Sequence, residues 1–399
     1  MTTMTNSHHS TRPAPRGLRR AARVGMVFVT ASALLIPAGA ASAATDGPLS
    51  DAPVVSQASG RLLGSSLFTT SILDNVVALR GATAINRGEV PSVVTDLPID
   101  FTAFGDLMNF QVGSTTLLGD NGIIRLSAVG QYAVANDDGS ASAFAGAISG
   151  APGLIGVGQV TGSDTGAPLA SDTAQITFGT PADPAYLKIS FGLLAASAQR
   201  TADGQVSGDY LIADARFEVG GTILSPVLAH LSGLADVLIG AFRAAGITLN
   251  NPISPNGTIT VSLQDLLDVA GIPNLNALPP GTNILQWLAD AVSLELMNLM
   301  LDLADAAVLA SAPATLFAAI PLRLAISAFR SGLNLFWPTM GQVLTLPLRL
   351  AIEAIAQVNV NYQRHGYDGS FTQTALRLGL GPGGILGSVD IASATVSGG

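Results

Sequence analysis

Residues 356–362 read Ala-Gln-Val-Asn-Val-Asn-Tyr, an alternation of apolar and polar side chains that is typical of a β-strand with one buried face. The glycine-containing residues 366–369 predict a turn, 371–380 a returning strand and 386–396 a last strand. These strands matter because they follow a long helical pattern. A strand pattern on both sides of a helical block predicts one β-rich domain into which the helices are inserted.

The first group of strand patterns lies between residues 57 and 224. Residues 123–134 alternate along much of their length, Asn136-Asp137-Asp138-Gly139 predicts a hairpin turn, and residues 140–148 predict the returning strand. Three further strands are expected, at 174–178, 186–191 and 210–219. Before them, residues 44–56 are small and polar and predict a flexible lead.

The periodicity changes at Ser225. This residue is a suitable N-cap, Pro226 follows at the first helical position, and apolar residues recur at helical spacing up to Gly246. The apolar positions are Leu228, Leu231, Ala235, Leu238 and Phe242. Ser262 predicts the start of a second, shorter helix with Asp265 in a capping box and Gly271 as its stop.

A Leu/Ala-rich helical pattern covers residues 283–332, and we expect Pro313 and Pro321 to break it. Another helical stretch covers 347–356. Together these patterns predict an α+β fold with a sandwich-like, β-rich domain. Its first part is residues 57–224, its Leu/Ala-rich helical insertion is 225–354, and its returning strands are 355–399.

The first 43 residues have the pattern of a secretory signal peptide. A basic region without acidic residues precedes an uncharged apolar run from Val24 to Pro37, and Ala41-Ser42-Ala43 provides small residues for cleavage before Ala44. The basic residues are Arg12, Arg16, Arg19, Arg20 and Arg23. We therefore expect export by the general secretory route, to the cell envelope or the medium.

Charge and cysteine content limit the possible partners and sites. The leader holds five of the 18 basic residues and no acidic ones, so 13 basic residues remain against 27 acidic residues, a net charge of −14. Such a surface repels nucleic acid and anionic lipid. Because the chain contains no cysteine, it can form no disulfide, thiolate metal site or cysteine nucleophile.

With this organisation in view, the chain resembles the choice-of-anchor G family of secreted actinobacterial proteins. The likeness rests on residues 56–63, the hairpin turn at 136–139, the segment from Tyr210 to Pro226, and the ending 387–396. It implies an exported envelope protein of unknown biochemical role, with no catalytic residues to transfer. Because no L-P-x-T-G motif or hydrophobic tail follows Val396, we expect release or non-covalent retention.

No motif predicts a catalytic or cofactor-binding residue. Asp137 and Asp138 are weak calcium candidates, because a calcium site needs several spaced oxygen ligands and these two carboxylates are adjacent. The mature chain has two histidines, His230 and His365, which are far apart in sequence. The simplest interpretation is that His230 packs beside the apolar stripe of its helix and that His365 lies in a solvated turn. Lys188, the only lysine, is expected on a strand surface.

The helical block is the least usual part of the sequence, because residues 306–322 and 331–348 carry no charge. Its prolines argue against clean membrane spans, so helices buried against a sheet are expected. Peripheral membrane contact through residues 283–356 is the alternative.

The sequence thus predicts a protein that acts by surface contact with an envelope or extracellular protein, glycan or lipid. A lipid- or membrane-active protein is the second hypothesis, and a secreted hydrolase with an unrecognised site is the third.

Overall fold

A computed structural model describes residues 52–65, 81–88, 90–96, 99–100, 110–112, 115–118, 124–126, 128–148, 174–275, 278–312 and 316–399. All of them belong to one unit of the chain, residues 41–399. The signal peptide predicted at 1–43, its cleavage-site residues Ala41, Ala43 and Ala44, and the predicted helix break at Pro313 lie outside the described residues.

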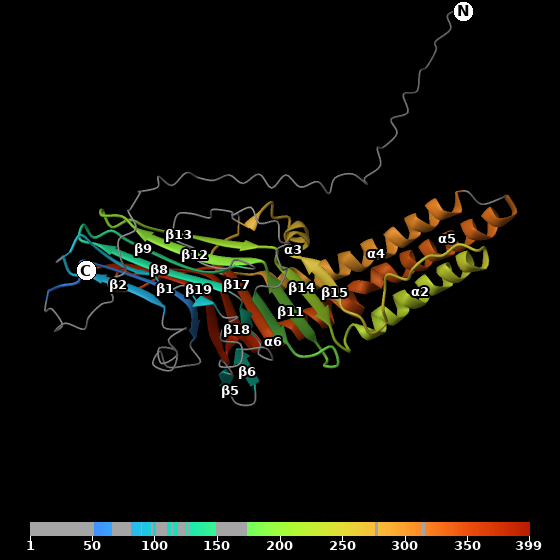
Figure 1. The fold of residues 1–399 in the computed structure, drawn as a ribbon. Helices are drawn as coiled ribbons and strands as arrows, with labels where there is room; N and C mark the ends of the chain where they lie inside the picture. Colours follow the sequence, from blue (N-terminus) through green and yellow to red (C-terminus); the bar gives the residue numbers. More distant parts are fainter. Residues whose placement is uncertain are drawn as a thin grey trace, which may run out of the picture. The chain divides into compact units, whose positions relative to one another are not determined.

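Three sheets and a set of helices build this unit, so the expected α+β, β-rich class is confirmed (Figure 1). Sheet A has the strand order β16-β17-β18-β19-β1-β2. Its strands are β1 (Ser56–Ser65), β2 (Ala82–Asn86), β16 (Thr282–Asn283), β17 (Ala356–His365), β18 (Phe371–Leu380) and β19 (Gly387–Gly398). The three strands expected after residue 355 are therefore present, and β19 pairs antiparallel with β1 from Ser56↔Gly398 to Ser65↔Val389.

Sheet B has the order β13-β12-β9-β8-β3, with β4 paired to β8. Its strands are β3 (Ser92–Asp96), β4 (Ile99–Asp100), β8 (Ala128–Asn136), β9 (Ala141–Ile148), β12 (Leu193–Arg200) and β13 (Val206–Ala213). The predicted hairpin turn is confirmed, since β8 and β9 pair across it from Ala135↔Ala141. The single strand expected at 123–134 is wrong in its first part, because residues 124–126 form a separate strand of another sheet. Arg200 of β12 fastens this turn by donating a hydrogen bond to the carbonyl of Gly139.

Sheets A and B pack face to face, with β1 and β19 against β8, β9 and β12. Small side chains fill the space between them. The buried residues of this layer are Ala58, Ala82, Ala84, Ala133, Ala135, Ala141, Ala143, Ala198, Phe371, Ala394 and Val396. Gly60 of β1 lies so close to sheet B that an added Cβ would be 2.7 Å from the carbonyl oxygen of Tyr132. Alanine and glycine therefore allow two backbones to approach closely in a sandwich.

Sheet C has the order β15-β14-β11-β10-β7-β6-β5. Its strands are β5 (Phe110–Val112), β6 (Thr115–Leu118), β7 (Ile124–Leu126), β10 (Ala174–Phe178), β11 (Tyr186–Phe191), β14 (Arg216–Gly220) and β15 (Ile259–Ser262). The prediction of a single strand at 210–219 is wrong. This segment belongs to two strands in different sheets, β13 and β14, because Asp214 adopts a left-handed φ of 51° and turns the chain between them.

Helices and two short strands form the block between β14 and β17. The helices are α2 (Ser225–Ala244), α3 (Leu263–Ala270), η5 (Ile284–Trp287), α4 (Leu288–Ser311), α5 (Leu316–Phe336), η6 (Trp337–Thr339), the π-helix η7 (Gly341–Thr345) and α6 (Leu346–Ile355). The two short strands, β15 and β16, were not expected in this block; they join sheets C and A. α5 packs against both α2 and α4 (Figure 1).

The predicted helix signals had different outcomes. The apolar stripe of α2 is buried as expected, and Ser262 and Asp265 form the predicted capping box of α3, with Gly271 left-handed at its end. Ser225 is not the N-cap of α2, because the helix is capped by Leu224 without a side-chain hydrogen bond. Pro321 does not break α5. It lies inside the helix, at the cost of one backbone hydrogen bond.

In sheet A, the face of the sheet on which buried side chains lie changes part-way along the strands. Asn361 of β17 and Ala392 of β19 have left-handed φ values of 52° and 56°. In β19, Val389 and Ile391 join the helical core, whereas Ala394 and Val396 join the alanine layer against sheet B. A left-handed residue shifts the alternation of side chains along the strand by one position. As a result, sheet A contributes side chains both to the helical core and to the alanine layer against sheet B.

Candidate functional site

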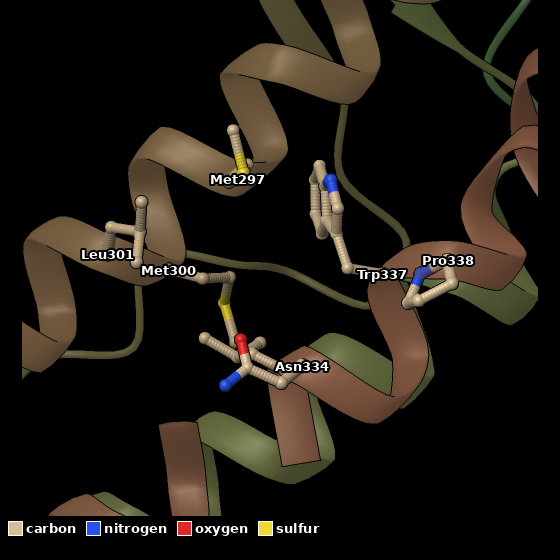
Figure 2. A pocket seen from close by; sticks show the side chains of 7 residues that line it. Met297, Met300, Leu301, Asn334, Trp337 and Pro338 are labelled. Carbon is tan, nitrogen blue, oxygen red and sulfur yellow. The ribbon is translucent and has the colours of Figure 1, made fainter. Parts of the chain in front are cut away.

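An apolar pocket lies between α4 and the end of α5. It has a volume of about 300 Å³ and is lined by Met297, Met300, Leu301, Leu333, Asn334, Trp337 and Pro338. Figure 2 shows Met300 reaching from α4 toward Asn334 on α5, with the indole of Trp337 facing the space between the helices. No lining residue has a titratable side chain, so the pocket offers shape, apolar contact and two polar groups, the Asn334 amide and the indole N–H.

Local sequence explains the position of the pocket. Met297, Met300 and Leu301 recur at helical spacing on one side of α4. Opposite α4, helix α5 ends at Phe336, and Trp337 and Pro338 begin the short 3₁₀ helix η6. This places the Trp337 indole at the pocket. Met300 and Leu333 are buried, whereas Leu301 is 45% exposed.

A second cavity, of about 340 Å³, lies where α6 meets the β18–β19 connection. Its lining residues are Asn283, Leu350, Glu353, Ala354, Gln357, Pro382 and Gly383. The Asn283 Oδ1 already accepts hydrogen bonds from the backbone N–H groups of Leu285 and Val358. Glu353 is the only titratable residue of this lining, so the cavity lacks a second carboxylate for acid–base chemistry.

Most of the large apolar side chains that are exposed among the described residues lie on the surface of the helical block. Leu309 of α4 is 75% exposed and Leu335 of α5 is 79% exposed. The others in the block are Val237, Leu301, Val308, Ile320, Leu324, Val343, Leu346 and Leu350. Soluble monomers rarely leave a large apolar patch open to water, and such a patch usually marks an interaction site.

The predicted calcium candidates lie in the β8–β9 turn. Ser140 donates its backbone N–H at 2.8 Å and its hydroxyl at 2.6 Å to Asp138 Oδ1. These hydrogen bonds, the hydroxyl's first, lower the pKa of Asp138 below its ordinary value. Asp137 is exposed, and its backbone N–H donates to the Pro91 carbonyl. Within the described ranges, no three His, Asp or Glu side chains gather where they could hold a metal ion.

The two histidines and the lysine have separate structural roles. The ring of His230 lies 4.4 Å from that of Phe336, and the ring of His365 lies 5.0 Å from that of Phe371. Neither histidine lines the two cavities described above. Lys188 Nζ lies 3.7 Å from Glu218 Oε2 on the neighbouring strand, which provides a simple ion pair for this lysine.

Sheet A carries a partly buried charge cluster on its polar face. Arg377 Nε lies 2.9 Å from Asp390 Oδ1, and the guanidinium stacks over the Tyr362 ring, 4.0 Å from its centroid. Desolvation raises the pKa of Asp390 above its ordinary value, and Arg377 offsets only part of this effect. Two hydroxyl pairs, Thr374–Ser393 and Thr372–Thr395, continue the same face.

Of the described helices, α2 is the one with the length and hydropathy of a membrane span, and 44% of its apolar window is buried inside the protein. The buried side includes Leu228, Leu231 and Phe242, which join the main core. This side is therefore occupied by contacts within the chain.

Comparison with known families gives one match. Residues 58–251 match a family described as a domain of unknown function (DUF8394). The match begins in β1 and ends shortly after α2, so it includes strands of all three sheets but neither α4 nor α5. No curated protein and no solved structure matches this chain. The apolar pocket therefore lies outside the part of the chain that the family covers.

Sequence reasoning did not identify the pocket residues. Residues 331–348 carry no charge, and this range includes Leu333, Asn334, Trp337 and Pro338. The facing residues Met297, Met300 and Leu301 belong to a helix whose apolar pattern extends around much of its circumference. Only the packing of α5 on α4 distinguishes those that line a cavity from those that fill the core.

Proposed function

We propose that this is an exported, non-catalytic protein of the cell envelope or the extracellular space, and that it acts by surface contact through its helical block. The observation that carries the proposal is the set of large apolar side chains exposed on α4, α5 and α6. Leaving them in water is unfavourable, and covering them with a partner would recover about 25 cal/mol for each Å² of apolar surface buried.

The export part of the proposal rests on the arginine-led apolar leader and on the absence of cysteine. The likeness to choice-of-anchor G proteins belongs to the same proposal, since those are exported envelope proteins. The acidic composition supports a partner other than nucleic acid, because the mature chain has 13 basic and 27 acidic residues.

A lipid surface is the second candidate partner, and the favouring observation is on α5. Ile320, Leu324 and Leu335 are exposed at helical spacing, and no charged residue lies between 306 and 322. The strongly acidic mature chain argues for a neutral lipid and against an anionic one.

Fractionation of a producing culture into wall, membrane and medium tests the proposal. The matched comparison is the double variant Leu324→Gln/Leu335→Gln on α5 against Leu211→Gln, an exposed leucine of sheet B. We expect the natural chain and Leu211→Gln in an envelope fraction and the α5 variant in the medium. Equal distribution of all three proteins would show that the helical block is not the contact surface.

Flotation with phosphatidylcholine liposomes separates the two candidate partners. If purified protein floats and the α5 variant does not, the contact is with lipid. If all proteins stay at the bottom while the culture fractions still differ, the partner is a protein or glycan. The hydrolase hypothesis requires turnover of a defined substrate that is abolished by a variant lining a mapped pocket.

A further inference from the structure

From the pocket between α4 and α5 we infer a binding site for the single alkyl chain of an uncharged amphiphile, such as a monoacylglycerol. This inference rests on the proposed function, because it assumes that the helical block is the contact surface and names the chemistry of a ligand bound there.

The size of the pocket favours one flexible chain. Its volume of about 300 Å³ is at the small end of ligand sites, which span about 300–1,000 Å³. Met297 and Met300 line it from α4. Methionine is unbranched and polarizable, so it adapts its shape to a chain that can bend in several ways.

The lining determines which part of the ligand enters. Leu301, Leu333 and Pro338 complete an apolar wall, and no carboxylate, guanidinium, ammonium or imidazole belongs to it. A charged group placed there would lose its hydration without gaining a partner, which costs several kcal/mol. The alkyl chain therefore belongs inside, and a charged headgroup has no counterion in the lining.

Two polar groups suit an uncharged headgroup. The Asn334 amide offers both a donor and an acceptor, and the Trp337 indole offers a donor. Asn334 is exposed and Trp337 partly buried, so they can meet a hydroxyl or ester near the opening while the chain lies deeper, toward buried Met300.

Tryptophan fluorescence provides a direct test, because the chain contains only two tryptophans, Trp287 and Trp337. In the Trp287→Phe protein, Trp337 is the single emitter. We expect monolauroylglycerol, below its critical micelle concentration, to shift the emission to the blue with saturation. An analogue with bromine on the acyl carbon next to the ester should quench it, because bromine quenches on contact and this carbon would lie beside the indole near the opening. Laurate and dodecyltrimethylammonium should bind at least about tenfold more weakly.

Filling the pocket should remove the effect. Met297→Phe/Leu301→Phe adds ring volume to the wall, and we expect it to weaken binding by about tenfold or more. Leu309→Phe adds the same group to an exposed position of α4 and should leave binding unchanged. Calorimetric titration of the natural two-tryptophan chain repeats the measurement if Trp287→Phe does not fold.

Absence of saturable quenching, or equal quenching in the filled and the control variants, would overturn the site. Tighter binding of either charged amphiphile would overturn the uncharged headgroup. These results are separable from the proposed function, because retention in an envelope fraction depends on Leu324 and Leu335, which do not line the pocket.

Discussion

Arg330 Nη2 of α5 lies 3.1 Å from Asp305 Oδ1 of α4, and this ion pair joins the two helices that form the pocket. Asp305 is one helical turn beyond Leu301, and Arg330 is one turn before Asn334. The pair therefore bridges the helices on the side of the pocket nearest the α4–α5 connection.

The first prediction concerns this pair. Both side chains are largely exposed, so a double-mutant cycle with Asp305→Asn and Arg330→Gln should give a coupling free energy of only about 0.2–1 kcal/mol. Urea unfolding of the four proteins measures it. High salt should reduce the coupling further. A coupling of several kcal/mol would mean that the pair is far better shielded from water than its exposure indicates.

The second prediction compares two glycines. In Gly60→Ala the added methyl group would overlap the Phe144 carbonyl between sheets A and B, so unfolding free energy should fall by about 1–3 kcal/mol or more. Gly240→Ala adds the same methyl group inside α2, where no atom lies within 4 Å. Helix propensity should then raise stability by about 0.5–1 kcal/mol. Similar urea midpoints for the two variants would refute close packing of the sheets.

The third prediction concerns the pH dependence caused by Asp390. Its folded pKa is raised above the ordinary 3.8 by desolvation. As pH increases from 3.8 toward the folded pKa, the unfolded chain loses this proton first, so Asp390 lowers stability as pH rises through that window. Asp390→Asn cannot ionise. Its stability relative to the natural chain should therefore improve between about pH 3 and about pH 7.

Chemical denaturation of both proteins across this range measures the difference. Asp368→Asn is the control, because hydrogen bonds from Ser370 lower the pKa of that exposed carboxyl. The trend of the control should be in the opposite direction. If Asp390→Asn instead loses relative stability as pH rises, ionised Asp390 is stabilised in the fold by Arg377 more than burial penalises it.

The fourth prediction concerns processing. The exported protein should begin at Ala44, which N-terminal sequencing or intact mass determines directly. Ala43→Arg should retain the leader, because the peptidase requires a small residue at this position. Recovery of the full-length chain in the cytosol, with its leader uncleaved, would contradict export by this route.

Much of the fold was accessible from local patterns. The strands of residues 356–396, the β8–β9 hairpin, the buried stripe of α2 and the capping box of α3 were all predicted correctly, because each depends on periodicity or on residues within a few positions. Errors arose where tertiary contacts compete with local signals. The chain changes sheets at Asp214, and α5 continues through Pro321, since packing offsets a local cost.

The sequence by itself therefore determined the class of the fold, the order of its main parts (strands, then helices, then strands) and the acidic, cysteine-free character of the chain. These depend on composition and on short-range periodicity. Only the tertiary structure decided that Gly60 lies against a carbonyl of sheet B, that the alternation of sheet A reverses at Asn361 and Ala392, and that Met300 and Trp337 face one cavity. Such proximities join residues that are far apart along the chain, and no local pattern encodes the distance between them.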